Sequence, residues 1–454
     1  MVKAVVGDRE FHKKFLSLVL PIALQQLMLA AVSASDAVML NFVSQDKMSA
    51  VSLAVQITFV ENLFLAAMTI GQSMLAAQYW GKKDVAAVEK VFAYVMKITV
   101  MVAWFFFLAA LCVPSFLMRL LTNEPVLIAE GATYLRIVSP SYLLAGVSQV
   151  YLCALKNSGK ARQAGVISAV CMAGDMLMNA ALIAGLWGFP RLEIAGAAIS
   201  TTVARTVEVL WCMAETARKN SVKLRRKYML HTDRRLAGSF WKHTAPVLGN
   251  EIVWGVGFTM VSVIMGHLGR DAVAAHAIAG VVKNLAACLC LGLAGGGGIL
   301  IGNELGAGRL ARARAYGGRL CALALLAGVV SGAVLLACSP LILALAEISD
   351  TAAGYLRGML HICAWYMIGK SVNATAVAGI FCAGGDSRFG LLCDAVVMWG
   401  IIVPTGLLAA FVLRLPVMAV YLLVSLDELL KLPAVYRHYK TYAWVKDLTI
   451  KEER

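Results

Sequence analysis

Long apolar stretches recur along almost the whole chain, beginning at Phe15. A helix that crosses the hydrocarbon core of a bilayer needs about 20 mostly apolar residues. Only 15% of the 454 residues are charged and 60% are hydrophobic, whereas soluble domains carry roughly a quarter charged residues. The sequence therefore predicts an all-α membrane protein with many spans, and it excludes an ordinary soluble enzyme.

Twelve transmembrane helices are predicted from these stretches. They cover residues 15–41, 50–79, 91–118, 129–155, 163–188, 194–217, 240–266, 272–301, 313–338, 350–382, 388–412 and 416–435. Twelve spans of about 25 residues leave roughly 150 residues for all loops and tails, which is too few for a folded domain in any one loop. Any activity is therefore expected inside the membrane, and we expect a multi-pass protein of the plasma (inner) membrane.

The formal net charge is +15, and the positions of the Lys and Arg residues along the chain indicate how the protein is oriented. Most Lys and Arg residues lie in or beside the N-terminus, the even-numbered connections and the C-terminus, and the odd-numbered connections hold few of them. The positive-inside rule then predicts that both termini are cytoplasmic. The connection 218–242 is the most basic, with Arg218, Lys219, Lys223, Arg225, Arg226, Lys227, Arg234, Arg235 and Lys242. Contact with anionic lipid headgroups explains this loop better than nucleic acid, which is not expected as a partner.

The two halves of the chain resemble each other. A shift of 225 residues pairs Pro21 with Pro246, and Gly81 with Gly306, without a gap. The intervening pairs are Asp46 with Asp271, Ala50 with Ala275, Ala54 with Ala279 and Gly71 with Gly296. Because the first apolar segment has a counterpart in the middle of the chain, it is predicted to be a retained span and not a cleaved signal peptide.

Six spans per half give both halves the same orientation in the membrane, related by a pseudo-two-fold axis along the membrane normal. We therefore expect an N-lobe at 1–217, a basic cytoplasmic linker at 218–239, a C-lobe at 240–435 and a cytoplasmic tail at 436–454. Two such parallel six-helix repeats are predicted to surround a central cavity. Transporters use this arrangement for alternating access, and the repeat alone therefore favours transport.

Short motifs carry a resemblance to a known family. Pro21 lies early in the first span and Asp36 near its end, and Ala77-Gln78-Tyr79-Trp80-Gly81 closes the second span. Gly302-Asn303-Glu304-Leu305-Gly306-Ala307-Gly308 closes the eighth, and Gly384-Gly385-Asp386-Ser387-Arg388-Phe389 precedes the eleventh. In their order and spacing over roughly residues 15–445, these motifs resemble the multidrug and toxic compound extrusion (MATE) family.

The resemblance implies a cation-coupled antiporter, not an enzyme, that exports organic, cationic or aromatic compounds. It implies no cofactor beyond H⁺ or Na⁺ as the coupling ion. Asp36, Asp175, Asn179, Thr201 and Glu251 match the family's coupling positions, and Asp36, Asp175 and Asn179 would be metal ligands only if Na⁺ is the ion. Asp175 and Asn179 reverse the family's usual order of Asn and Asp. The carboxylate expected on the tenth span is replaced by Lys370-Ser371. The expected partners are a small organic substrate and membrane lipids, and a monomer is expected.

Ionisable residues inside the bilayer are costly, and each is a candidate for function, with a structural ion pair as the alternative. In the first half, Asp36, Glu61 and Asn179 are predicted at a similar depth. Asp175 and Asn179 are four residues apart and so share a helix face. Burial disfavours an ionised carboxylate and bound Na⁺ favours it, as a proton or sodium switch requires. The alternative for Asp175 is a structural pair with Arg205.

The second half has its own charged candidates. Glu251 is the counterpart of Gln26, so a neutral amide suffices at the equivalent place. Glu251, Lys283 and Lys370 are predicted near mid-depth, as either a structural triad or a proton-controlled gate. Asp394 is predicted on the cytoplasmic side of the eleventh span, either solvated or paired with Arg388.

Two other functions remain open from the sequence. A flippase for a lipid-linked precursor would share the two-lobe architecture but would favour a cationic cavity, to which Lys283 and Lys370 could contribute. An intramembrane lipid-modifying enzyme is the less favoured alternative, because no HExxH or GxSxG motif occurs and such an enzyme does not need a repeat.

Overall fold

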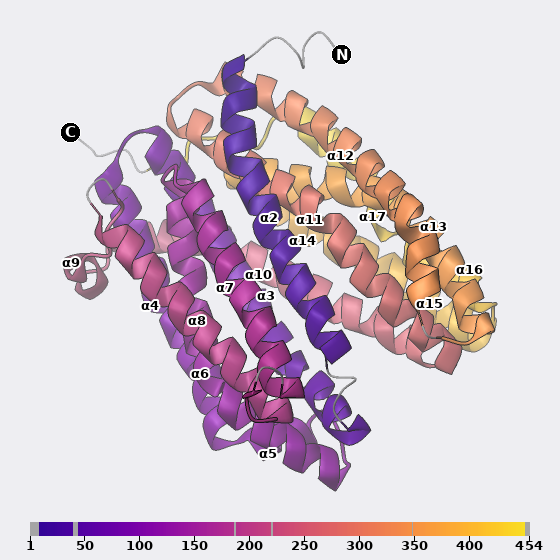
Figure 1. The fold of residues 1–454 in the computed structure, drawn as a ribbon. Helices are drawn as coiled ribbons and strands as arrows, with labels where there is room; N and C mark the ends of the chain where they lie inside the picture. Colours follow the sequence, from indigo (N-terminus) through magenta and orange to yellow (C-terminus); the bar gives the residue numbers. More distant parts are fainter. Residues whose placement is uncertain (1–8, 40–43, 186–187, 219–220, 347, 450–454) are drawn as a thin grey trace. The chain divides into compact units, whose positions relative to one another are not determined.

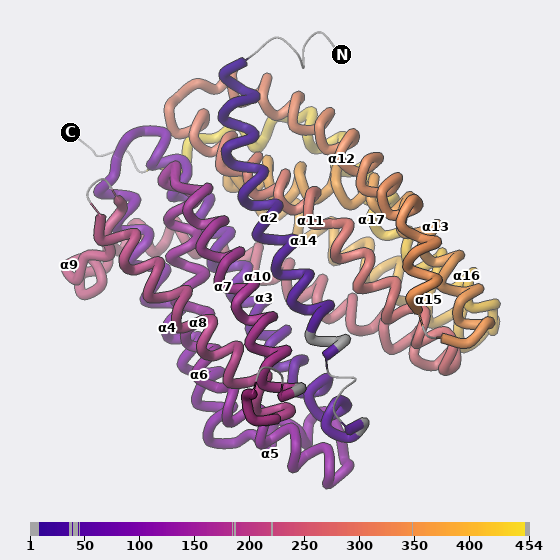
Figure 2. The backbone as a smooth tube through the Cα atoms, in the orientation of Figure 1, coloured from indigo at the N-terminus to yellow at the C-terminus, as the bar shows by residue number. Residues whose placement is uncertain are grey.

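The computed structural model describes residues 9–39, 44–185, 188–218, 221–346 and 348–449, apart from the side chains of residues 36–38, 45 and 184. Every regular element in these ranges is a helix, as Figure 1 shows. Figure 2 traces the same path as a tube through the Cα atoms. The prediction of an all-α membrane protein is confirmed.

The helices of the first half follow the predicted spans closely. The long ones are α2 (Arg9–Met39), α3 (Gln45–Gly81), α4 (Val85–Cys112), α6 (Pro125–Asn157), α7 (Ala161–Ala184) and α8 (Glu193–Ala217). Two short helices, α5 (Pro114–Arg119) and α9 (Arg226–Leu230), lie in connections.

The second half contains α10 (Arg234–Gly266), α11 (Arg270–Gly306), α12 (Leu310–Leu345) and α13 (Asp350–Asn373). The π-helical segment η3 (Ala374–Phe381) continues α13. The eleventh predicted span alternates between α-helix and π-helix, as α14 (Arg388–Asp394), η4 (Ala395–Ile402), α15 (Val403–Leu407) and η5 (Leu408–Val412). The chain ends with α16 (Val417–Val424) and α17 (Asp427–Lys440).

The last predicted span, 416–435, is wrong as a single helix. The chain breaks at Ser425 and Leu426, and α17 begins with Asp427 and Glu428. Carboxylates are favoured in the first turn of a helix, because the partial positive charge of the unpaired N–H groups lies there. The apolar stretch before the break and the charged stretch after it therefore form separate helices.

Nine helical segments within the described parts of the chain are long and apolar enough to cross a membrane. They are α2, α3, α4, α6, α7, α10, α11, α12 and the segment Arg388–Val412. Many large apolar side chains on such helices are exposed, including Phe105 and Val412, which are 68% and 69% exposed. A hydrocarbon environment explains these exposed side chains, because a soluble surface rarely carries apolar residues over so many elements. The chain is a multi-pass membrane protein.

Several helix ends follow from local sequence. Asp84 caps α4 by accepting a hydrogen bond from the backbone N–H of Ala87 at 2.9 Å. Ser349 caps α13 through the backbone N–H of Ala352 in the same way. Pro125 starts α6 at a position where its missing N–H costs nothing, and Gly185 ends α7 in the left-handed conformation.

Two compact units are distinguished by their internal contacts. One unit, called unit 1 here, contains Met1–Leu27, Ala77–Lys83 and Trp241–Arg454. The other, unit 2, contains Met28–Ala76 and Asp84–Phe240. Most of unit 1 comes from the second half of the chain, together with the first part of α2 and the end of α3.

Ion pairs within unit 2 show which connections lie at the same end. Glu89 near the start of α4 pairs with Arg225, and Lys160 before α7 pairs with Glu215 near the end of α8. At the opposite ends of the helices, Lys47 near the start of α3 pairs with Glu193 at the start of α8. Alternate connections therefore gather at opposite ends, as an up-and-down helix arrangement requires.

Candidate functional site

Asp175 on α7 and Ser200 on α8 form the polar centre of unit 2. The Ser200 hydroxyl lies 2.6 Å from Asp175 Oδ1 and 2.9 Å from the backbone carbonyl of Asp175. Asp175 is only 6% exposed. The hydroxyl therefore supplies a hydrogen bond to a carboxyl group that burial has removed from water.

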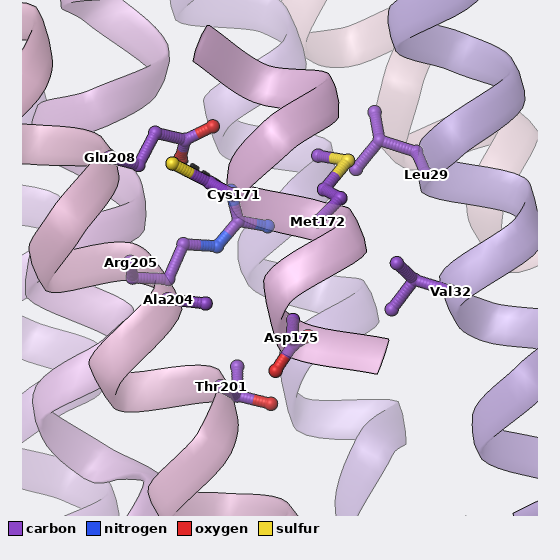
Figure 3. Close-up of a pocket in the computed structure, with 9 residues that line it drawn as sticks. All are labelled: Leu29, Val32, Cys171, Met172, Asp175, Thr201, Ala204, Arg205 and Glu208. Carbon is purple, nitrogen blue, oxygen red and sulfur yellow. Dashed lines mark hydrogen bonds and ion pairs between the residues drawn. The ribbon is translucent and has the colours of Figure 1, made fainter. Parts of the chain in front are cut away.

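A small pocket opens beside this pair, drawn in Figure 3. Its lining comes from three helices of unit 2 and consists of Leu29, Val32, Cys171, Met172, Asp175, Thr201, Ala204, Arg205 and Glu208. Its volume is about 40 Å³, whereas one water molecule needs roughly 10–15 Å³ by this measure. The pocket can hold water or a small cation, and it is far too small for a drug-sized molecule.

Arg205 is the cation of this pocket. Its guanidinium is 2.8 Å from the carboxylate of Glu208, one turn along α8. Asp175 and Glu61 are its other charged neighbours, and neither lies within ion-pair distance of it. Figure 3 shows Arg205 and Glu208 together at one end of the pocket, with Asp175 and Thr201 at the other. Arg205 therefore forms its ion pair with Glu208 and not with Asp175.

Three other residues predicted in the first half are Asn179, Glu61 and Asp36. The side chains of the first two are described by the structure, and that of Asp36 is not. Asn179 is on α7, one turn after Asp175, and is 1% exposed. Glu61 lies on α3 and is also 1% exposed. The backbone of Asp36 belongs to α2, but its side chain is outside the described residues. Within the described residues, no group of three or more His, Cys, Asp or Glu side chains is arranged to hold a metal ion.

A second charged cluster lies in unit 1, around α17. The Lys370 ammonium on α13 is 3.2 Å from Glu428 Oε1. Asn373, one turn further along, donates to Glu428 Oε2 at 2.8 Å. Lys431 lies 2.6 Å from Asp394 and 3.6 Å from Asp427. These buried charges are matched by opposite charges.

The predicted triad of Glu251, Lys283 and Lys370 is not formed as an ion-pair cluster. Glu251 takes part in none of the ion pairs among the described residues, and Lys370 pairs with Glu428 instead. The Lys283 ammonium lies over the ring of Tyr366 at 4.8 Å from its centroid. Asp394, expected to be solvated or paired with Arg388, pairs with Lys431. The physical reason is that α17 brings its own carboxylates and lysine to α13 and to the end of α14.

Sequence reasoning did not single out Ser200, Asp427, Glu428 or Lys431 as site residues. Ser200 has a weak signal, since it precedes Thr201 at the position matched to the family. The other three have a clear one, because three charges within five residues interrupt an apolar stretch of spanning length.

Comparison with known proteins now adds to this geometry. The MatE family model matches residues 21–180 and 246–408. The second match begins 225 residues after the first, which is the offset of the internal repeat. The Burkholderia pseudomallei protein named "Probable multidrug resistance protein NorM" is 28% identical over 412 residues, covering 86% of this chain and 84% of that protein. The "Uncharacterized transporter YisQ" of Bacillus subtilis is 20% identical over 444 residues, covering 97% and 96%.

Solved structures share the fold. A mutant of the Vibrio cholerae MATE transporter VcmN superposes with a TM-score of 0.88 at 15% identity, over 98% of this chain and 99% of that one. A transporter of the MOP superfamily from Pyrococcus furiosus gives a TM-score of 0.87 at 14% identity, over 99% of both chains. With a family model that matches both halves, this chain belongs to the MatE family, the multidrug and toxic compound extrusion family that its motifs resemble.

Proposed function

We propose that this protein is a cation-coupled antiporter that exports organic compounds, cationic or aromatic in character, by alternating access. The observation that carries the proposal is the buried acidic centre of Asp175 and Ser200 beside a pocket of ion size, inside a chain of the MatE family. The relative named as a probable multidrug resistance protein supports organic compounds as cargo.

The size of the pocket indicates which of the two transported species, the coupling ion or the organic substrate, it can bind. About 40 Å³ accommodates a proton carrier, a water molecule or Na⁺, whereas an organic substrate needs several hundred Å³. The pocket is therefore proposed as the ion site, with Asp175 as its acid and Thr201 as an oxygen ligand. Asp36 and Asn179 are proposed to complete it.

The membrane arrangement belongs to the same proposal. The N-lobe at 1–217 and the C-lobe at 240–435 are proposed to rock against each other around a central cavity. The protein is proposed to lie in the plasma membrane with both termini and the linker 218–239 on the cytoplasmic side. The reason is that the termini and the even-numbered connections hold most of the Lys and Arg residues. A monomer suffices, since one chain contains both repeats.

A flippase for an anionic lipid-linked precursor is the second candidate, and the buried lysines bear on it. Such a substrate needs cationic side chains that are available for its headgroup. Lys370 is already paired with Glu428, and Lys283 lies over the rings of Tyr366 and Phe258. These contacts favour an organic cation over an anionic headgroup as cargo.

Transport by the purified protein in proteoliposomes tests the proposal. Ethidium is the cargo, and proton and sodium gradients are imposed separately. Ethidium movement against its own gradient, driven by either ion, is the expected result. The matched control is Asp175→Asn, which keeps the size of the side chain and removes the charge. Ethidium that only equilibrates, at the same rate as in empty liposomes, would reject the antiporter.

A further inference from the structure

Glu61 differs from the other buried carboxylates of the protein. Within the described residues, each of the others has a cation or a hydroxyl as partner: Glu89 with Arg225, Asp175 with Ser200, Glu208 with Arg205, Glu215 with Lys160, Glu304 with Arg309, Asp427 with Lys431 and Glu428 with Lys370. Glu61 is 1% exposed, forms no ion pair with a described residue, and its Oε1 atom has no hydrogen-bond partner among these residues. Among the described carboxylates that are almost fully inaccessible to solvent, it is the one left uncompensated; Glu251 also forms no ion pair with a described residue, but it is partly exposed.

None of the groups that the structure describes around Glu61 offers it a partner at contact distance. Arg205 on α8 is its charged neighbour, and that guanidinium is engaged by Glu208 at 2.8 Å. Tyr142 on α6 is its titratable neighbour, and the Tyr142 hydroxyl is 3.3 Å from Thr58, one turn before Glu61. Asp175 on α7 acts on the same guanidinium. Two acids, Glu61 and Asp175, thus share the field of one arginine that is already paired.

The internal repeat shows that the carboxyl group is not needed for packing. In the gapless shift of 225 residues that pairs Gly71 with Gly296, the residue equivalent to Glu61 is Ala286 of α11. Ala286 is a small apolar residue that packs beside a buried apolar cluster in its own unit. The fold therefore accepts an apolar side chain at the equivalent place, and the charge at position 61 has another reason.

We propose that Glu61 is a second proton-binding acid of unit 2, which is neutral in the described state and exchanges its proton during transport. An isolated ionised carboxylate is costly in a low-dielectric interior, so a partnerless Glu61 is held as the carboxylic acid. A proton from water on one side of the membrane forms the O–H bond at the carboxyl group. That bond breaks when Arg205 moves between Glu208 and Glu61 and faces both carboxylates, and the proton leaves to water on the other side.

This inference rests on the proposed antiport, and it assigns to Glu61 a role that no resemblance to the family supplied. It also explains why Arg205 lies in an acidic pocket. A guanidinium that faces both Glu208 and Glu61 lowers the cost of ionising the second acid, and a cationic substrate would supply the remaining counter-charge.

Infrared spectroscopy of the purified protein in lipid nanodiscs tests the proposal directly. The difference between wild type and Glu61→Gln isolates the C=O absorption of the protonated Glu61 carboxyl group. We expect this absorption at acidic pH, and we expect it to decrease on raising the pH or on adding ethidium. An absorption that neither pH nor ethidium changes would show a permanently neutral packing residue. Its complete absence would show a permanently ionised one. Either result overturns the proposal.

Two further variants separate the possible failures. Glu61→Ala copies the residue of the other repeat and is expected to fold with an unchanged melting temperature. Glu208→Gln removes the ion-pair partner of Arg205 and frees this guanidinium for Glu61, so it is expected to weaken the absorption of the protonated Glu61 at a given pH. In transport, Glu61→Gln is expected to lose the pH dependence of the ethidium rate. If wild type moves no ethidium, the antiporter proposal fails. The pH titration of the infrared absorption without ethidium still tests whether Glu61 binds and releases a proton.

Discussion

Gly81 packs directly against the backbone carbonyl of Asn303, and a methyl group on Gly81 would lie 2.1 Å from that oxygen. The repeat produces the same contact with the roles exchanged. A methyl group on Gly306 would lie 1.9 Å from the backbone carbonyl of Gln78. Since Gln78 and Asn303 are equivalent in the repeat, as are Gly81 and Gly306, the ends of α3 and α11 cross with an approximate two-fold relation within unit 1.

Alanine at either glycine should therefore destabilise the protein. The contact atoms belong to backbone and cannot rotate away, so Gly81→Ala and Gly306→Ala must separate the two helices. Overpacking of this kind costs roughly 1–3 kcal/mol. We expect a lower melting temperature in detergent for each variant.

The matched control for this crossing is Gly280→Ala, on the same helix as Gly306. Apart from the adjoining turns of α11 itself, no atom of the described residues lies within 4 Å of a methyl group there, and alanine is the better helix former by about 1 kcal/mol. Its melting temperature should stay the same or rise. Equal losses in all three variants would show that the close crossing of α3 and α11 is not the cause.

The prediction for Glu428→Gln follows from the cluster around α17. This substitution leaves Lys370 and Lys431 short of one buried counter-charge. Breaking a buried ion pair from one side costs roughly 3–5 kcal/mol. A large drop in melting temperature is expected, and the double variant Glu428→Gln with Lys370→Met should recover part of it.

Glu251→Gln is expected to behave differently. No ion pair of the described residues includes Glu251, and Gln26 holds the equivalent place in the first half. We therefore expect an unchanged melting temperature together with slower ethidium transport. A loss of stability as large as that of Glu428→Gln would instead make Glu251 a structural charge.

The fold could be predicted from the sequence to a large extent, because membrane spans depend on local composition. A helix in lipid must be apolar over about 20 residues whatever its neighbours are. The break between α16 and α17 was missed because the apolar run up to Val424 and the mixed run from Asp427 together have the length of one span. A charge count within the span would have indicated it.

The site could be predicted only as a set of residues, and its pairings could not. Lys370 and Glu428 are 58 residues apart, and their contact depends on how α13 and α17 are rotated about their axes. The same is true of Asp175 and Ser200. Periodicity places a residue on a helix face, but which face meets which helix is decided by packing of the whole unit.

The C-terminal segment provides a further prediction. Trp444 is fully buried, stacks on Tyr439 at 5.7 Å between centroids, and donates to the Tyr439 carbonyl at 3.2 Å. Nearby, Gln78 accepts a hydrogen bond from the Leu448 backbone at 2.6 Å and so ties this segment to α3. Replacing a buried Trp with Ala costs roughly 3–5 kcal/mol.

We therefore expect Trp444→Ala to lower the melting temperature clearly. Tyr436→Ala is the matched control, because that side chain is 59% exposed and surface changes usually stay within about 0.5 kcal/mol. A Trp444→Ala protein as stable as the control would mean that residues 441–449 contribute little to unit 1.

The final prediction is that the coupling ion is the proton. Na⁺ binds through several oxygen ligands at once. Among the described residues around the pocket, Asp175 already accepts a hydrogen bond from the Ser200 hydroxyl, and the other acid, Glu208, is paired with Arg205. A resident guanidinium also repels a second cation. At the tenth span, where the resemblance to the family would place a sodium carboxylate, Lys370 brings its own positive charge to Glu428.

Ethidium export should therefore follow a proton gradient at constant sodium. Export driven by an inward sodium gradient at equal pH on both sides would overturn this assignment, and its loss in Asn179→Ala would place the sodium site in unit 2.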